Sequence, residues 1–177
     1  MGVVLSFTTD AAEVARARDG LRLSQGPAWW EEIALNFATE FVVEGVNLFA
    51  TGAQSGTTIM VGPDGDVAGS ARRVDFTTAK VPVLNVMTSG RRALSNAIAH
   101  GQGTWGVAGD GTVMFTLHGS SITVESTAQK GVQLVAPASE FVKAFEEYRR
   151  AATSFVGAEL PEMFDDPAWR AAIRAFD

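Results

Sequence analysis

The chain has 177 residues, 46% of them hydrophobic and 19% charged, a balance that predicts one globular domain over residues 1–177 with a substantial core. The formal net charge of −6 argues against nucleic acid as the main partner, because phosphate binding requires a basic surface. Cysteine is absent, which excludes disulfides, thiol nucleophiles and cysteine-ligated metals.

The opening sequence MGVVLSFTTD contains a short apolar stretch without a basic segment before it or a cleavage site after it. No apolar run in the chain is long enough to cross a bilayer. We therefore expect no membrane association and a cytoplasmic location.

The first quarter of the sequence predicts two helices. Residues 8–20 can begin at a Thr9 or Asp10 cap and end at Gly20. Residues 26–45 place Trp30, Ile33, Phe37 and Phe41 at helical spacing, although the segment FVVEGVNLFATG (41–52) can equally pass into a strand.

The middle of the chain predicts short strands separated by turns rich in glycine. These strands are NLFATG (47–52), TTIMVG (57–62), DVAGSARRV (66–74) and VPVLNVM (81–87), with the tight turn PDGD at 63–66. A helix over 88–101 follows, capped by Thr88 or Ser89, with Leu94 and Ile98 directed inward and Gly101 at its end.

Residues 104–137 form the clearest β region. Apolar residues alternate with polar ones along TVMFTLHG (112–119), so that Val113, Phe115 and Leu117 share one face and Thr112, Met114, Thr116 and His118 the other. The segments SSITVES (120–126) and GVQLVAP (131–137) continue this meander, with Ile122 and Val124, then Val132 and Leu134, alternating in the same way.

Two helices complete the predicted chain. Residues 138–157 carry an apolar stripe and a Glu146–Arg150 pair, and residues 165–176 begin with Asp166 as cap and Pro167 in the first turn. The stripe consists of Phe141, Phe145, Tyr148, Ala152 and Phe155. The sequence therefore predicts an α+β fold in which one mainly antiparallel sheet, a meander, is covered by N- and C-terminal helices.

Gly101, Gly103 and Gly106 have the G-x-G-x-x-G spacing of a dinucleotide-binding turn. In such a turn a strand leads into the glycines and a helix follows, whose N-terminus binds the pyrophosphate. Here a predicted helix leads in and a predicted strand leads out. We therefore expect no nucleotide cofactor, and interpret residues 100–106 as a helix C-cap followed by an exposed loop.

No motif in the sequence assembles a catalytic or metal site. The two histidines, His100 and His118, lie outside any metal-ligand pattern, and Asp64 and Asp66 lack the later ligands of a calcium loop. Adjacent helical pairs such as Glu31 and Glu32 diverge and cannot act as a carboxylate dyad. The sequence thus favours a non-enzymatic binding protein with no metal and no cofactor.

Two segments are the candidate partner-binding loops. The first contains Gly101, Gln102, Gly103 and Trp105, and the second contains Ser70, Arg72 and Arg73. Tryptophan is favoured at binding hot spots, but Trp105 can also be a core residue at a sheet edge. If the loops bind a partner, Trp105→Ala or Arg72→Ala should weaken binding at least about tenfold and leave stability nearly unchanged.

The strand meander VMFTLHGSSITVESTAQKGVQLV followed by PASEFVKAFEEYRRAATSF resembles small actinobacterial immunity proteins of polymorphic toxin systems. The resemblance is one of element pattern over about residues 80–156. It implies an antitoxin that occludes the active site of a cognate toxin, including toxins that hydrolyse NAD.

Two alternatives remain open at this point. One is an enzyme or small-ligand binder with a pocket between sheet and helices lined by Trp29, Trp30, Phe37 and Phe115. The other is a structural domain that forms oligomers through a strand edge or its C-terminal helix.

Overall fold

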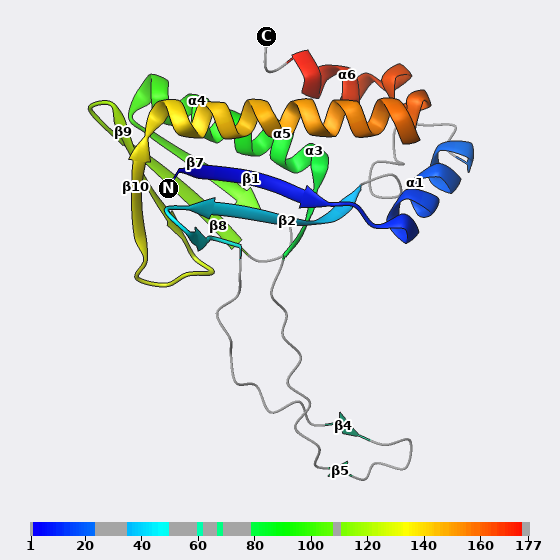
Figure 1. The fold of residues 1–177 in the computed structure, drawn as a ribbon, viewed down its shortest axis with the longest axis horizontal. Helices are drawn as coiled ribbons and strands as arrows, with labels where there is room; N and C mark the ends of the chain where they lie inside the picture. Colours follow the sequence, from blue (N-terminus) through cyan, green and yellow to red (C-terminus); the bar gives the residue numbers. More distant parts are fainter. Residues whose placement is uncertain are drawn as a thin grey trace.

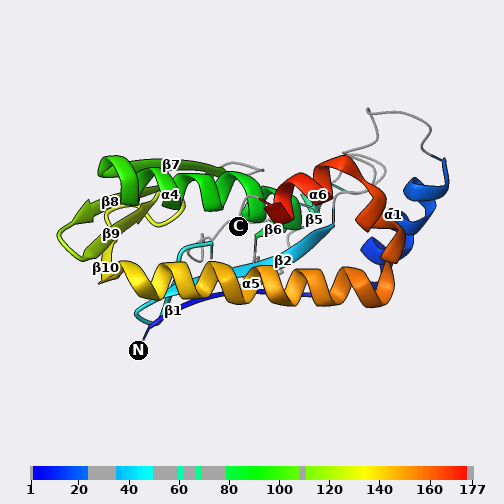
Figure 2. The ribbon, with the colours of Figure 1, turned by 90° about the horizontal axis from the view of Figure 1, so that it is seen from above.

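The computed structural model describes residues 2–23, 35–49, 60–61, 67–68, 79–107 and 111–174. Its elements confirm an α+β fold, but apart from one separate two-stranded pair its strands form two four-stranded antiparallel sheets instead of one main sheet. Helices α4 (Arg91–His100) and α5 (Ala138–Glu159) lie side by side over these sheets (Figures 1 and 2). The buried side chains of both sheets and of the helices form one hydrophobic cluster.

The first sheet contains β1 (Val3–Thr8), β2 (Asn36–Val43), β3 (Val46–Asn47) and β6 (Lys80–Pro82). Strand β2 pairs with β1 on one side and with β3 and β6 on the other. The apolar stretch at the start of the sequence, for which no strand was predicted, is therefore an edge strand of this sheet.

The predicted helix over 26–45 is wrong for residues 36–43, which form β2. Phe37 and Phe41 are four residues apart, a spacing that fits one helix face and also one strand face. Thr39 and Val43 complete the strand face, since both are buried, whereas Glu40 between them is exposed. Because Thr39 is polar, the apolar alternation of this strand is interrupted in the sequence. Its buried hydroxyl donates to the Phe37 carbonyl at 3.0 Å.

The second sheet is the predicted meander, with β7 (Gln102–Val107), β8 (Gly111–His118), β9 (Ser121–Ser126) and β10 (Gln133–Pro137) paired in chain order. Val113 and Phe115 are buried on the helix side and Met114 is exposed on the opposite side, as predicted. A separate short pair joins β4 (Met60–Val61) to β5 (Val67–Ala68), within two of the predicted strands. Leu48 and Phe49, predicted to be in a strand, form a turn after β3.

The segment 81–87 is mostly helical, which corrects the predicted strand. After Pro82 the chain enters α3 (Val83–Asn85), a π-helical turn (Val86–Gly90) and then α4. A short apolar run does not distinguish a buried strand from a buried helix, and here Val83, Val86 and Met87 are buried at helical spacing. Within α4 Leu94 is buried as predicted, but Ile98 is 42% exposed.

The helices at the two ends follow the sequence signals with small differences. Helix α1 (Ala11–Leu23) is capped by Asp10, whose carboxylate accepts the Ala12 N–H at 2.9 Å, and it continues past Gly20. Helix α6 (Pro167–Arg174) is capped by Asp166 through the Trp169 N–H at 2.9 Å, after a 3-10 turn at Pro161–Asp165. In α5, Glu146 pairs with Arg149 rather than with Arg150.

Helix α5 joins the two sheets through aromatic side chains. Phe141 and Phe145 both contact Phe41 of β2, and they also contact Phe115 of β8 and Trp105 of β7, respectively. The predicted stripe is confirmed, since Phe141, Phe145, Tyr148 and Ala152 are buried and Phe155 packs against the core. Between the sheets, the Ser126 hydroxyl also donates to the Leu48 carbonyl at 3.0 Å.

Candidate binding surface

The predicted exposed loop at 100–106 is instead the junction of α4 with strand β7. Gly101 ends α4 in a left-handed conformation with φ 88°, and its N–H donates to the Ala97 carbonyl at 2.8 Å. Its carbonyl accepts the Leu117 N–H at 2.8 Å, which starts the pairing of β7 with β8. Gly101 therefore has a structural role as the predicted helix cap.

Gly103 permits close packing of β7 against α4. A Cβ atom at this position would lie 1.8 Å from the Ala93 carbonyl oxygen and 3.1 Å from the Ala97 nitrogen. Both of these are backbone atoms of α4, so the strand can approach the helix only without a side chain here. This contact accounts for glycine at residue 103 without a partner.

Trp105 is fully buried at 0% exposure, which contradicts its proposed direct contact with a partner. Its ring contacts Phe41, Phe49 and Phe145, and its indole N–H donates to Asn85 Oδ1 at 2.8 Å. The large apolar ring is buried and its polar nitrogen is satisfied, so Trp105 follows the alternative prediction of a core residue.

Of the remaining predicted partner residues, one is exposed and the others are not described by the structure. Gln102 is exposed on the face of the sheet that points away from the helices. Ser70, Arg72 and Arg73 lie outside the described residues, as do Trp29 and Trp30.

Strands β7 to β10 present one side to α4 and α5 and leave the other uncovered by any described element. We call this second side the outer face, and its residues alternate with the buried ones along each strand. The register aligns them in rows across the sheet. One row is Gln102, Thr116, Thr123 and Val135, and the next is Thr104, Met114, Glu125 and Gln133.

The outer face combines hydroxyl and amide groups with two exposed apolar side chains. Met114 is 42% exposed near the centre of the face and Val135 is 55% exposed on the edge strand β10. Glu125 is the sole acidic or basic residue in these two rows, and its carboxylate accepts a hydrogen bond from Gln133 Nε2 at 2.7 Å. The surface is therefore weakly charged and able to donate and accept hydrogen bonds.

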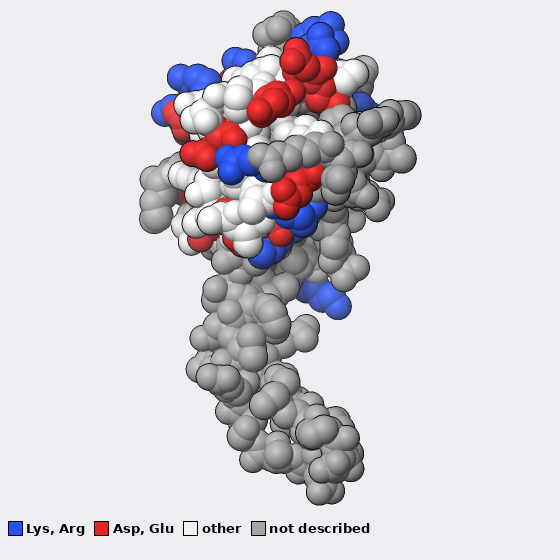
Figure 3. Space-filling model, turned by 90° about the vertical axis from the view of Figure 1, so that its right-hand side faces the viewer, with Lys and Arg blue, Asp and Glu red and all other residues white. Residues whose placement is uncertain are grey.

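The end of the molecule that carries α1 has the opposite character. Positive and negative side chains are interspersed there (Figure 3). Arg16 pairs with Glu13 at 2.7 Å, and Arg18 pairs with Glu159 at 3.5 Å. This mixture is typical of a solvated surface, in contrast to the outer face.

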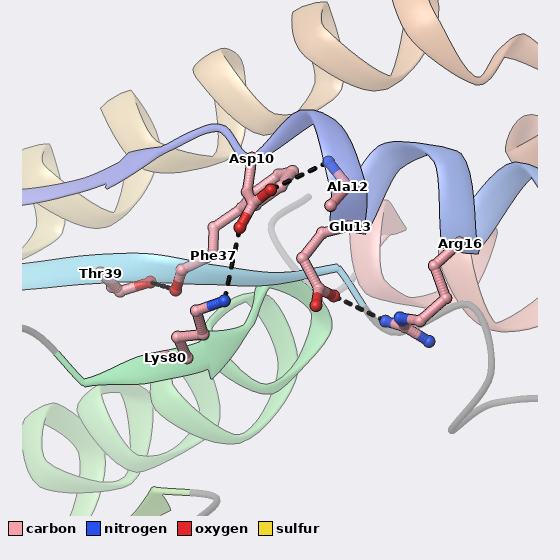
Figure 4. Close-up of polar contacts among 7 residues, drawn as sticks. All are labelled: Asp10, Ala12, Glu13, Arg16, Phe37, Thr39 and Lys80. Carbon is pink, nitrogen blue, oxygen red and sulfur yellow. Dashed lines mark hydrogen bonds and ion pairs between the residues drawn. The ribbon is translucent and has the colours of Figure 1, made fainter.

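Asp10 at this end connects α1 to strand β6 (Figure 4). Its carboxylate accepts the Ala12 N–H and pairs with Lys80 at 3.4 Å. The Ala12 backbone N–H, followed by Lys80, lowers the pKa of Asp10 from its usual 3.8. A carboxylate that caps a helix and pairs with a lysine of the neighbouring strand has a structural role.

Tyr148 is the single tyrosine of the chain and is almost fully buried on the inner side of α5. Burial raises the pKa of its phenol well above the usual value of 10.0, and the neighbouring Thr39 hydroxyl opposes that shift. Its ring packs edge-on against Phe7 at 5.1 Å between centroids. The phenol is therefore enclosed in the core and does not face a surface site.

The described part of the chain contains no group of three or more His, Asp or Glu side chains able to hold a metal ion. His100 and His118 are both exposed, at the end of α4 and the end of β8. In the same part of the chain, no helix has the length and apolar character needed to cross a membrane.

Comparison of the chain with protein-family models, curated proteins and solved structures found no match. We therefore infer the function from the geometry of the outer face and from the sequence pattern. Sequence alternation could place Thr112, Met114, Thr116 and His118 on one side of β8, but it could not show that the neighbouring strands extend this side into a wider uncovered surface.

Proposed function

We propose that the protein is a non-catalytic binding protein that contacts a partner protein through the outer face of β7–β10. The observation that carries this proposal is the depletion of charge on a sheet surface that also exposes Met114 and Val135, since Glu125 is the one charged residue in its two rows. Depletion of charged residues and enrichment of methionine distinguish the centre of protein interfaces from ordinary surface.

The outer face is smaller than a standard protein–protein interface. With strands about 4.8 Å apart and a rise of about 3.4 Å per residue, four strands of about five residues cover roughly 300 Å². A standard interface buries about 800 Å² on each partner. The partner must therefore also contact residues beyond this face, and the sequence prediction offers Ser70, Arg72 and Arg73 for that second contact.

The resemblance to immunity proteins suggests what this partner is. We propose that it is the enzymatic domain of a cognate toxin, such as one that hydrolyses NAD, and that binding occludes its active site. A rigid sheet suits this role because little conformational entropy is lost when a preformed surface binds. The proposal includes a cytoplasmic location, since an antitoxin must meet the toxin inside the cell that it protects.

The alternative of a small-ligand pocket receives less support from the described residues. Phe37 and Phe115, two of its four proposed lining residues, are fully buried against other rings. Phe37 stacks on Phe7 at 5.5 Å, and Phe115 lies 5.9 Å from Phe141.

The proposal predicts that the gene upstream of this chain encodes a secreted protein with a C-terminal toxin domain, and that domain is the partner used in the test. Binding is measured by titration calorimetry, and inhibition by the loss of NAD hydrolysis as the chain is added. We expect wild-type protein to inhibit and Met114→Lys to weaken binding at least about tenfold, because it buries an unpaired charge in the interface.

Ile98→Lys is the matched control, because Ile98 on α4 has the same 42% exposure as Met114 but lies on a different element. We expect it to bind like wild type. Thermal unfolding by circular dichroism establishes that both variants remain folded. Equal binding by wild type and Met114→Lys refutes the outer face as the site, and an upstream toxin that is neither bound nor inhibited refutes the antitoxin function.

A further inference from the structure

Glu125 of β9 is the one charged residue in the two aligned rows of the outer face, and it lies between Met114 of β8 and Gln133 of β10. Glu125 is half-buried, whereas Met114 and Gln133 are exposed. The three residues come from three neighbouring strands, and the register places them directly beside one another. The row therefore brings an apolar, an anionic and an amide side chain together at one place.

The strand pairing holds the side chains of Glu125 and Gln133 close together. The Ala138 N–H donates to the Ser120 carbonyl at 2.9 Å, so Ser120 and Ala138 form a hydrogen-bonded pair at the end of β9 and β10. Pair types alternate along an antiparallel ladder, and Glu125 and Gln133 lie an odd number of positions further on, which makes them a non-hydrogen-bonded pair. Side chains of such pairs are the closer ones. Accordingly, Gln133 Nε2 donates to Glu125 Oε1 at 2.7 Å.

This hydrogen bond determines which polar atoms remain free. A carboxylate only accepts hydrogen bonds, so the amide nitrogen of Gln133 faces Glu125 and the amide oxygen is the free end. In the described part of the chain Glu125 forms no ion pair, and neither Glu125 Oε2 nor Gln133 Oε1 has a hydrogen-bond partner. Two adjacent acceptors, one of them charged, are thus available to donors from another molecule.

The side chain that matches these acceptors is arginine. A guanidinium carries five N–H groups in a planar fork, so it can donate to the carboxylate and to the neighbouring amide oxygen at the same time. The ammonium of lysine is a compact and more strongly hydrated charge, and it loses more hydration when it is enclosed. The centres of protein interfaces are accordingly enriched in arginine and depleted in lysine.

Met114 provides an apolar contact for the rest of an arginine side chain. It is 42% exposed and is the neighbour of Glu125 on the side opposite to Gln133. Arginine packs its aliphatic part along apolar surface while its guanidinium reaches polar groups. The net charge of −6 on the chain also favours the approach of a basic partner over a longer range.

We propose that Met114, Glu125 and Gln133 form an arginine-recognition site, and that the toxin domain presents an arginine to it. The identity of the partner rests on the proposed function, whereas the preference for arginine rests on the row itself. Glu125 supplies the charge, Gln133 orients the carboxylate and adds the second acceptor, and Met114 packs against the aliphatic part. A partner without a donor at this position would leave the Glu125 carboxylate enclosed and unpaired, so the site selects among partners.

The first test uses no toxin. N-acetylarginine amide and N-acetyllysine amide are titrated separately into the labelled protein at low salt, and chemical shifts are followed by NMR. We expect the arginine compound to shift the Gln133 side-chain amide and the Met114 methyl group, with an affinity at least about threefold higher than that of the lysine compound. In Glu125→Gln these shifts should be lost, because charge-assisted hydrogen bonds are about twice as strong as neutral ones.

Two further variants separate the roles within the site. Gln133→Ala removes the second acceptor, so the arginine compound should lose most of its advantage over the lysine compound. Glu147→Gln is the matched control, because it makes the same change of charge at an exposed residue of α5, off the outer face. It should bind both compounds like wild type. Thermal unfolding by circular dichroism establishes that the variants remain folded.

The second test uses the toxin domain and titration calorimetry. Glu125→Gln should raise the Kd at least about tenfold, and Glu147→Gln should leave it unchanged. Each exposed arginine of the toxin domain is then replaced by glutamine. Replacement of the arginine that meets Glu125 should weaken binding to the wild-type chain but not to Glu125→Gln, as a double-mutant cycle requires for two groups in contact.

The two tests separate failure of this inference from failure of the proposed function. Equal responses to the two compounds, or responses that persist in Glu125→Gln, overturn the arginine site. If the arginine compound binds as expected but the toxin domain does not bind, the site stands and the proposed function fails. If the toxin domain binds wild type and Glu125→Gln equally well, the proposed function stands and its recognition through an arginine is refuted.

Discussion

Substitution of Gly103 by alanine should be among the most destabilising single changes in this chain. The new Cβ atom would lie 1.8 Å from the Ala93 carbonyl oxygen and 2.7 Å from its carbon. Contacts under 3.0 Å are essentially never made by real Cβ atoms, so α4 and β7 must separate by at least about 1.2 Å. Backbone atoms cannot turn aside as a side chain would.

The separation disturbs the packing between α4 and the sheet. Leu94 and Ala97 of α4 and Trp105 of β7 are fully buried in the common core, and moving the helix loosens all of them. Overpacking of a well-packed core costs about 1–3 kcal/mol and more where the backbone must move. We expect Gly103→Ala to lower the free energy of unfolding by about 3–5 kcal/mol.

Urea unfolding followed by circular dichroism measures this loss, provided that the m-value is unchanged. Gly106→Ala in the same strand is the control, because nothing lies within 4 Å of its added Cβ atom. The control should stay within about 0.5 kcal/mol of wild type. A Gly103→Ala variant within about 1 kcal/mol of wild type would refute the steric argument and restore Gly103 as a candidate contact residue.

Three further outcomes are expected. Trp105→Ala should lower the free energy of unfolding by about 3–5 kcal/mol, measured by urea unfolding, because it empties a fully buried site; a loss under about 1 kcal/mol would favour the surface role. The pKa of Asp10 is lower in the folded protein than its usual 3.8, so its contribution to folding stability is present above pH 3.8 and is lost as the pH falls below that value. In Asp10→Asn the free energy of unfolding, measured against pH, should fall less steeply below pH 3.8. The pKa of Tyr148 is raised, so its contribution to folding stability is full below pH 10.0 and declines as the pH rises above that value. Phenolate absorbance should therefore appear only as the protein unfolds, whereas a surface tyrosine would titrate in the native state. Tyr148→Phe should remove the decline in stability.

The elements with strong periodicity could be predicted from the sequence. The meander and α5 were found because alternation at 112–118 and the stripe from Phe141 to Phe155 persist over several residues. Strand β2 was mistaken for a helix because the spacing of Phe37 and Phe41 fits both structures. Strand β1 was missed because its partner, β2, lies about thirty residues away, and pairing of that kind leaves no local signal.

In the candidate site too, some features follow from local sequence and others depend on residues distant in the chain. Gly101 as a helix cap and Gln102 as an exposed residue follow from local sequence. The structural role of Gly103 depends on Ala93, and the burial of Trp105 depends on Phe41 from the other sheet, so neither could be predicted from residues 100–106 alone. The rows of the outer face depend on the strand register, which alternation along single strands does not provide.

The ring of Phe41 has a consequence for how the chain can be divided. It belongs to the N-terminal sheet, yet it contacts Trp105 and Phe115 of the C-terminal meander and Phe141 of the long helix. A cut between Pro82 and Val83 would leave the two fragments with complementary halves of one aromatic interior. Neither fragment would fold by itself, but the two should reassemble when mixed, and heat should melt the intact chain in a single step.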